Sequence, residues 1–220
     1  MISVIIPTLN AGRPLPRCFD SLIGAAVRGT VREVIISDGG SGDDTLMIAD
    51  AAGAHIARGG RSRSAQLVAG IALARCDWLL FLHPATALET GWEAEAESFI
   101  HQARPGRPRA AVFRFAREEF GGKARRAELR AAWRSALVGL PYGDQGLLIP
   151  RRLYQKVGGY RALPAMEDAD IVRRIGRRRL VQLRSRAINL AQPHDSAVRG
   201  LALTLLHALR IPSRVLARFD

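Results

Sequence analysis

Carboxylates and arginines gather at two places in the first third of the chain where they could do chemistry. Asp38 follows an apolar run and precedes "GGSGDDT", so it could accept hydrogen bonds from a ribose or a base edge, or cap the turn before the next helix. "RGGRSRSAQ" places Arg58, Arg61 and Arg63 around two glycines, just before a helix. Glycine admits a phosphate close to the backbone, and arginine offers a bidentate fork. A solvated basic loop fits this stretch equally well.

A third cluster lies in the second half of the chain. "MEDAD", residues 166–170, offers three carboxylates in five residues. One of them could serve as a general base beside an acceptor hydroxyl. The alternative is the acidic first turn of a helix. Helical spacing predicts that Glu167 and Asp170 share a face while Asp168 points elsewhere.

The elements that must position these side chains alternate along the chain. Buried-strand patterns occupy residues 2–6, 31–40, 54–59 and 77–83, and helical patterns occupy residues 15–27, 41–53 and 61–76. This alternation predicts a parallel sheet with helices on both faces. Ligands bind beyond the carboxyl ends of such strands, where Asp38, the arginines from Arg58 to Arg61, and His83 are expected.

The pattern weakens after about residue 88. We expect helices over 91–103, 121–139 and 165–183, a strand over 110–120, and a short strand followed by a turn within 142–160. No repeat or low-complexity linker interrupts the chain. The organisation predicted is one domain over 1–220, with a nucleotide-binding half (1–88), an acceptor half (89–195) and a C-terminal amphipathic helical segment (196–220).

Bulk composition limits the class of protein. The 220 residues are 48% hydrophobic and 24% charged, which fits a folded globular chain rather than a disordered one. The net charge of +13 attracts nucleotide phosphates, nucleic acid or an acidic membrane surface. The basic run at 173–179 has no interleaved aromatic residues, so no specific nucleic-acid partner is predicted. Without a leader pattern or a long apolar segment, we expect a cytoplasmic protein.

Several ordered motifs resemble those of the family 2 glycosyltransferases, which have the GT-A fold. They are "SVIIPTLNAG", "EVIISDGGSGDDT", "GRSRSAQLVAGIALARCDWLLFLHPAT" and "GDQGLLIPRRLYQKVGGYRALPAMEDADIVRRI". The stretches "FLH", "GDQG" and "PAMED" look most like a small bacterial subgroup labelled arsenosugar-biosynthesis-associated. The resemblance implies a single α/β GT-A domain, with a mostly parallel central sheet flanked by helices. It also implies inverting transfer of a sugar from a nucleoside diphosphate sugar, with UDP favoured, to an acceptor hydroxyl.

The resemblance assigns roles on the donor side. Thr8 and Asn10 would lie by the base, with Asp38 on the base or ribose, and Arg61 would face the diphosphate. The family's metal motif is DxD, but this chain has "HPA" at residues 83–85 and neither aspartate. A neutral His83 can ligate Mn²⁺, whereas Mg²⁺ prefers oxygen and alanine ligates nothing. The stretch therefore predicts a weak His83-dependent metal site or none, with arginines stabilising the leaving group.

On the acceptor side, the resemblance makes Asp168, of the pair Glu167–Asp168, the base that deprotonates the acceptor. Asp144 and Gln145 would line the acceptor side. The acceptor itself is not identified by these motifs.

Two alternatives stay open. The missing acids at 83–85 favour a catalytically inactive GT-A fold that binds a nucleotide or acts as a scaffold, while the retained "MEDAD" favours an enzyme. The segment 196–220 mixes leucines with arginines. It could rest on anionic lipid, near a lipid-linked acceptor, or pack on the core or on a second subunit in a homodimer.

Overall fold

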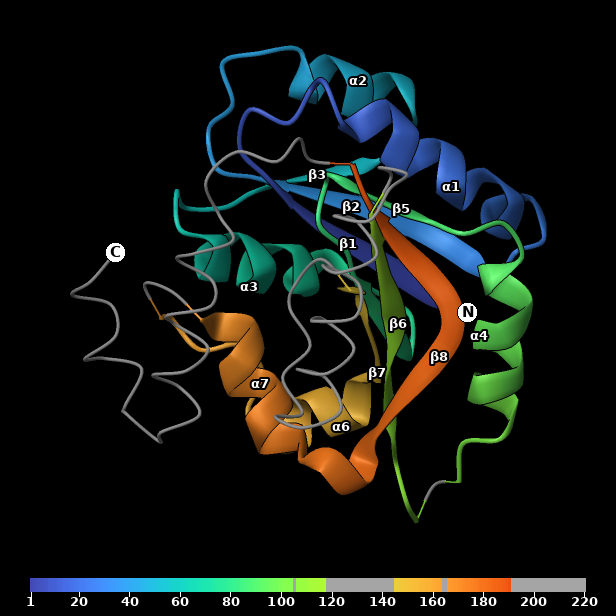
Figure 1. Cartoon of the computed structure of the whole chain (residues 1–220). Coiled ribbons are helices and arrows are strands. Elements are labelled where there is room, and N and C mark those ends of the chain that lie inside the picture. Colours follow the sequence, from blue (N-terminus) through green and yellow to red (C-terminus); the bar gives the residue numbers. More distant parts are fainter. Residues whose placement is uncertain (105, 118–144, 164–165, 191–220) are drawn as a thin grey trace.

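The computed structural model describes residues 1–104, 106–117, 145–163 and 166–190 (Figure 1). The helix expected over 121–139 and the segment 196–220 lie outside these residues. The first half contains β1 (Ile2–Thr8), α1 (Leu15–Val27), β2 (Val31–Asp38), α2 (Thr45–Ala51), β3 (His55–Arg58), α3 (Arg63–Leu73), β4 (Trp78–Phe81) and β5 (Thr86–Leu88). The second half contains α4 (Trp92–His101), β6 (Ala110–Arg117), β7 (Leu147–Pro150), α6 (Arg151–Lys156), α7 (Glu167–Ile175), the 3₁₀ turn η2 (Arg177–Arg179) and β8 (Leu180–Asn189).

Within the described residues, the strands form one eight-stranded sheet in the order β3-β2-β1-β4-β7-β6-β8-β5. The first four of these strands run parallel to one another. β7 is antiparallel to both of its neighbours, β6 and β8 are parallel, and β5 is antiparallel to β8. The sheet is mixed but mostly parallel, as the alternating pattern predicted.

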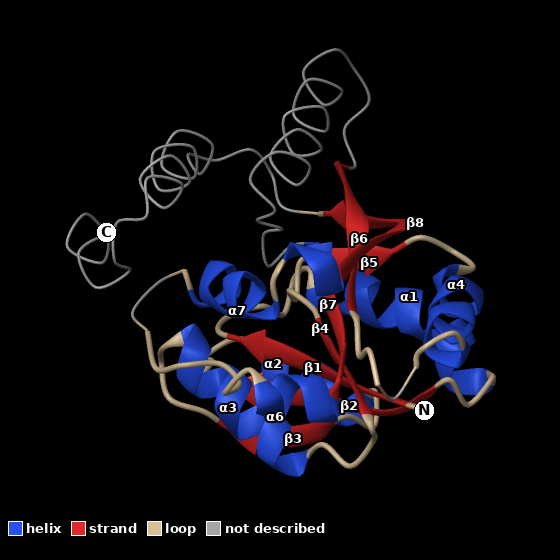
Figure 2. Cartoon of the chain, turned by 90° about the horizontal axis from the view of Figure 1, so that it is seen from below, coloured by secondary structure: helices blue, strands red, loops and turns tan. Residues whose placement is uncertain are grey.

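Helices cover both faces of the sheet. Alternate residues of β1 point to opposite faces, so Ile2, Val4 and Ile6 pack on the face covered by α1, α2 and α4, while Ile5 packs with α3, α6 and α7. Seen from below, α1 and α4 lie on one side of the strands, and α3, α6 and α7 on the other (Figure 2). Both layers bury aliphatic side chains, which fixes the sheet and leaves its carboxyl edge for the loops.

β1 continues past the expected end at Ile6 to Thr8, with Pro7 inside it. The backbone oxygen of Ile5 accepts from Leu82 on the β4 side, and Pro7, two residues further, faces the same side. β4 ends at Phe81, which is level with Ile5. Because no strand continues there, the missing N–H of Pro7 costs no ladder hydrogen bond.

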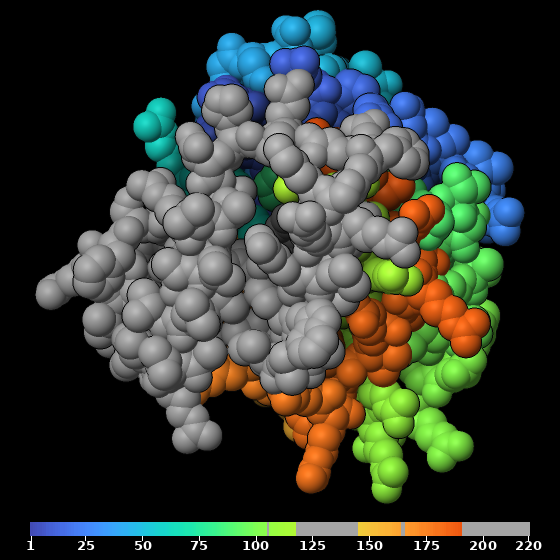
Figure 3. All heavy atoms as spheres, in the orientation of Figure 1, coloured from blue at the N-terminus to red at the C-terminus, as the bar shows by residue number. Residues whose placement is uncertain are grey.

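Three elements of the second half were missed or misassigned by the pattern. The turn expected after β7 is the helix α6, and the helix expected over 165–183 ends at Ile175, after which β8 begins at Leu180. β8 is irregular, because its pairing with β6 shifts register between Val112 and Arg114. Figure 3 shows β8 lying against α4 on one face of the molecule. Among the helices of the described ranges, none is long and apolar enough to cross a bilayer.

Candidate functional site

The carboxyl ends of three parallel strands place predicted site residues side by side. In the register of the sheet, Thr8 of β1 is level with Asp38 of β2, and Asp38 is level with Arg58 of β3. The Thr8 hydroxyl donates a hydrogen bond of 3.0 Å to Asp38 Oδ1. This adjacency follows from parallel pairing alone, because strands that run together end at the same edge.

Asp38 is almost fully buried and accepts four hydrogen bonds. Oδ1 accepts from the hydroxyls of Thr8 and Ser41, and Oδ2 accepts from the backbone N–H groups of Gly40 and Ser41, each at 2.8 Å. Burial by itself would raise the pKa of Asp38, but these hydrogen bonds outweigh it and the pKa is lowered. Four acceptances saturate a carboxylate. With all four of these hydrogen bonds made within the protein, Asp38 organises the turn that follows β2.

The loop after β1 is joined to that turn. The Asn10 backbone lies in the left-handed region with a φ of 51°, its Oδ1 accepts from the Gly42 N–H at 2.9 Å, and its N–H donates to Ser41 Oγ at 2.8 Å. Further along, the Gly12 N–H donates to Asp43 Oδ2 at 2.9 Å. The stretch around Asn10 and the turn after Asp38 thus form one connected rim above the strand ends.

A buried glutamine packs under the glycines of this rim. The Gln66 side chain of α3 donates through Nε2 to the Arg61 backbone carbonyl. The Gln66 backbone carbonyl accepts from the Ser37 hydroxyl. A Cβ on Gly39 would lie 2.2 Å from Gln66 Nε2, and one on Gly59 would lie 2.7 Å from Gln66 Cα. At Gly59 the contact is with helix backbone, so only glycine fits there, whereas the contact at Gly39 is with the end of the Gln66 side chain.

Arg61 and Arg63, on either side of the α3 N-cap Ser62, have different environments. Arg61, predicted to face a diphosphate, is exposed, and its guanidinium pairs with no carboxylate of the described residues. Arg63 is the first residue of α3, after the N-cap Ser62, and reaches the start of α7. The family resemblance assigned the diphosphate to Arg61, whereas Arg63 is the arginine that contacts the acidic pair in the second half of the chain.

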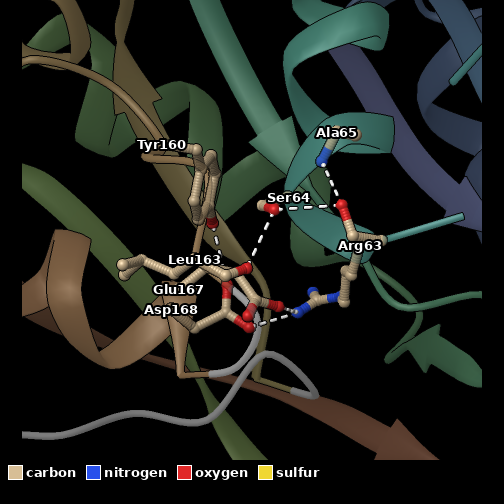
Figure 4. Close-up of polar contacts among 8 residues, drawn as sticks. Arg63, Ser64, Ala65, Tyr160, Leu163, Glu167 and Asp168 are labelled. Carbon is tan, nitrogen blue, oxygen red and sulfur yellow. Dashed lines mark hydrogen bonds and ion pairs between the residues drawn. The ribbon is translucent and has the colours of Figure 1, made fainter. Parts of the chain in front are cut away.

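Arg63 bridges the predicted acidic pair (Figure 4). Its Nη1 donates to Glu167 Oε1 at 2.8 Å and also to Asp168 Oδ2. The Tyr160 hydroxyl donates to Asp168 Oδ1 at 2.9 Å, so both oxygens of Asp168 are engaged. Ser64, next to Arg63, donates to the Leu163 carbonyl at 3.0 Å and ties the same two regions together. Tyr160 carried no recognisable signal in the sequence.

Burial and charge set the ionisation of this cluster. Glu167 is 7% exposed, and its pKa is raised, first by burial and then by the neighbouring charge of Asp168, with Arg63 opposing. Burial acts to lower the pKa of Arg63, but the charges of Asp168 and Glu167 outweigh it and the pKa is raised. Burial, reinforced by Asp168, raises the pKa of Tyr160 well above its ordinary value, which keeps its hydroxyl a donor.

Glu167 and Asp170, predicted to share a face of the helix, have different partners. Asp170 accepts from Arg174 Nε at 2.9 Å, four residues along α7, whereas Glu167 shares Arg63 with Asp168. Glu167 and Asp168 are the first two residues of α7. One long side chain arriving at the helix start therefore reaches both, although they are adjacent in sequence.

His83 stands where the family's metal motif is expected. It follows β4, and its Nδ1 accepts the Ala85 N–H at 3.1 Å. A neutral ring that accepts at Nδ1 carries its hydrogen on Nε2, which is then a donor rather than a metal ligand. Ala85 has no ligand atom, and the described part of the chain contains no group of three His, Cys, Asp or Glu that could hold an ion. The residues at 83–85 therefore do not fit a divalent metal.

Of the two residues expected on the acceptor side, Gln145 is buried two residues before the start of β7. It is followed by Gly146, whose φ is 67°. Asp144 lies outside the described residues.

The arrangement of the sheet, its carboxyl-edge loops and the flanking helices defines a GT-A-like α/β fold, as predicted. Residues 3–86 match the family described as Glycosyl transferase family 2. The chain superposes on glucosyl-3-phosphoglycerate synthase from Mycobacterium tuberculosis in complex with Mn²⁺ and UDP-glucose, with a TM-score of 0.65 and 20% identity over 96% of this chain and 80% of that one. The complex of the same synthase with Mn²⁺, UDP and glucosyl-3-phosphoglycerate gives a TM-score of 0.63 at 21% identity, covering 96% of this chain and 81% of that one.

Sequence relatives point the same way. A PGL/p-HBAD biosynthesis glycosyltransferase of Mycobacterium bovis (strain BCG / Pasteur 1173P2) is 34% identical over 113 residues, which are 48% of this chain and 43% of the relative. A protein of the same description from Mycobacterium tuberculosis (strain ATCC 25177 / H37Ra) matches equally. The chain thus spans less than half the length of the curated relatives it matches.

Proposed function

We propose that this chain is a family 2 glycosyltransferase that moves a sugar, with inversion, from a nucleoside diphosphate sugar to an acceptor hydroxyl, with UDP as the favoured nucleotide. Support comes from the match of residues 3–86 and from relatives that are themselves glycosyltransferases. The observation that carries the proposal is the ion pairing between the acidic pair Glu167–Asp168 and Arg63, at the end of the glycine-containing loop. A candidate base and a candidate phosphate loop are thereby neighbours. We also propose that residues 1–220 form a single GT-A-like domain.

On the donor side, the nucleoside would lie over the rim built by Thr8, Asn10 and Asp38, and the exposed Arg61 would face the diphosphate. Asp38 saturates its oxygens within the protein, so a base or ribose contact there requires exchange of one of its four hydrogen bonds. The hydroxyl donors of Thr8 and Ser41 are the ones to exchange, because a rotation about χ1 releases either of them while the two backbone donors stay in place. Release of Ser41 also gives up its hydrogen bond from the Asn10 N–H.

In the reaction, an Asp168 oxygen takes the proton of the acceptor hydroxyl while the hydroxyl oxygen forms a bond to the anomeric carbon. The bond from that carbon to the diphosphate oxygen breaks, and the electron pair leaves with the nucleoside diphosphate. The negative charge that develops on the departing diphosphate must be stabilised by a positive charge, and Arg61 of the loop before α3 supplies it. The proposed reaction uses no metal ion, since residues 83–85 do not fit one. Gln145, with Asp144, would border the acceptor.

A second function, nucleotide binding without catalysis, is favoured by one observation. His83, Pro84 and Ala85 replace the acidic metal motif, and Nδ1 of His83 is used within its own turn. A chain of this kind would bind the nucleotide and serve as a sensor or scaffold.

The deciding experiment measures release of nucleoside diphosphate from a panel of nucleotide sugars by the wild-type chain and by Asp168→Asn. Loss of general base catalysis is expected to slow turnover by about 10²–10⁴-fold. Asp170→Asn is the matched control, because Asp170 lies on the same helix but pairs with Arg174. Turnover that survives Asp168→Asn would remove the assigned base. Nucleotide binding without turnover for any donor would establish the second function instead.

A further inference from the structure

Arg63, the first residue of α3, is the side chain through which the start of this helix contacts the acidic pair. Its guanidinium is tied to α7 through Nη1 alone, which serves both Glu167 and Asp168. Its side chain is 27% exposed. A guanidinium carries five N–H donors in a planar fork, so a single nitrogen leaves most of that capacity unused.

The unused donors form one edge of the group. Nε is buried and has no hydrogen-bond partner. Nη2, on the same edge, forms no hydrogen bond with the described residues. The pair Nε and Nη2 is the edge that binds carboxylate or phosphate oxygens in a bidentate manner. A buried donor left unpaired is costly, and such a group calls for an acceptor.

The neighbourhood favours a phosphate oxygen as that acceptor. Arg63 follows Gly59, Gly60 and the exposed Arg61 in the loop where the donor diphosphate is proposed to lie. Within the cluster, one guanidinium faces the two carboxylates Glu167 and Asp168, so a diphosphate arriving at the free edge competes with them for the same positive charge.

We propose that Arg63 acts on both the donor side and the acceptor side. Its Nε–Nη2 edge binds the diphosphate of the donor while Nη1 contacts Asp168, and donor binding thereby weakens the hydrogen bond from Arg63 to the base. This inference rests on the proposed function and adds to it a positioning residue that couples donor binding to the acceptor side. An empty site keeps Asp168 paired with Arg63. An occupied site draws the guanidinium toward the phosphates and leaves Asp168 oxygen free to take a proton.

The test is a double-mutant cycle on UDP affinity, measured by isothermal titration calorimetry with wild type, Arg63→Gln, Asp168→Asn and the double variant. Titrations are run with EDTA and with Mn²⁺, and the cycle uses the condition in which wild type binds more tightly. Loss of a charge-assisted hydrogen bond predicts about ten-fold or weaker binding in Arg63→Gln. Asp168→Asn removes the competitor, so UDP binding tightens, and this gain disappears in the double variant.

Two further variants keep the test decisive. Arg63→Lys retains the charge next to the carboxylates but has no side edge, so the melting temperature is kept while UDP affinity falls. Arg32→Gln, an exposed arginine near the amino end of β2, removes one charge far from the cluster and leaves UDP affinity unchanged.

The outcomes separate the two proposals. If UDP binds wild type and Arg63→Lys equally well, Arg63 merely holds α7 and the shared role is wrong. If Asp168→Asn tightens UDP to the same extent with and without Arg63, the effect is general electrostatics and the coupling is also wrong. If neither UDP nor GDP, CDP or TDP binds wild type, the proposed function itself fails.

Discussion

The guanidinium of Arg63 and the carboxylate of Asp168 form an ion pair although 105 residues of sequence separate them. Arg63 belongs to the stretch that matches the glycosyltransferase family, whereas Asp168 lies beyond it. The structure therefore brings the matched and unmatched parts of the chain to a common site. The Tyr160 hydroxyl completes this site on the other oxygen of Asp168.

Replacing Glu167 by Gln tests the electrostatics of that site. The folded-state pKa of Glu167 is raised, chiefly by burial, above the ordinary value of about 4.3. The favourable contribution of Glu167 to the free energy of unfolding is therefore present below its unfolded-state pKa and is lost as pH rises through its folded-state pKa. Glutamine has no such loss and still offers an oxygen to Arg63. We expect the difference in unfolding free energy, variant minus wild type, to increase as pH rises, measured by urea unfolding across that range.

The opposite trend would contradict this interpretation. If Glu167→Gln became progressively less stable than wild type as pH rose, the ion pair with Arg63 would outweigh burial and the repulsion from Asp168. The Asp168 side chain is 19% exposed, so water screens part of that repulsion.

Asp38→Asn probes the turn after β2. The folded pKa of Asp38 is lowered, so its stabilising contribution is present above the unfolded pKa and is lost as pH falls through the folded pKa. Asparagine provides one acceptor oxygen where four donors converge. We expect the variant to lose about 1–3 kcal/mol at neutral pH, and the gap to narrow below about pH 3.9. Asp50→Asn, an exposed carboxylate on α2, serves as the control and should leave stability unchanged.

Much of the fold could be predicted because its first half follows local rules. The helix predicted over 15–27 is α1 with the same bounds, and four apolar runs became the four parallel strands. β8 was missed because polar residues at 184–186 separate its buried residues Leu183 and Ala187, and a spacing of four also suits a helix. Glu95 of α4 accepts from the backbone N–H groups of Arg184 and Ser185 in this part of the strand.

The site was predictable to the extent that it follows from strand ends. Thr8 and Asp38 meet because parallel strands end together. The choice between Arg61 and Arg63 could not be made from the sequence, because the partner carboxylates are more than a hundred residues away. The Ser62 N-cap marks Arg63 as the first helical residue, but it does not identify the partners of its side chain.

Gly59→Ala tests the close approach of the loop to α3. A Cβ there would lie 2.7 Å from Gln66 Cα and 3.2 Å from Gln66 N, and helix backbone cannot yield as a side-chain end can. We expect a loss of about 1–3 kcal/mol in unfolding free energy from overpacking, together with weaker UDP binding. Gly42→Ala is the control, because its Cβ would meet nothing within 4 Å. Equal stability of the two variants would mean that the loop has room to shift.

Position 83 distinguishes a turn residue from a metal ligand. Asparagine at this position can accept the Ala85 N–H with its side-chain oxygen, as in an Asx turn, whereas alanine cannot. We expect His83→Asn to keep the melting temperature and His83→Ala to lose about 0.5–1.5 kcal/mol, the contribution of one hydrogen bond. We also expect UDP to raise the melting temperature of wild type equally with EDTA and with Mn²⁺. A shift that requires Mn²⁺ in wild type and vanishes in both variants would make His83 a metal ligand, and arginine alone would then not account for diphosphate binding.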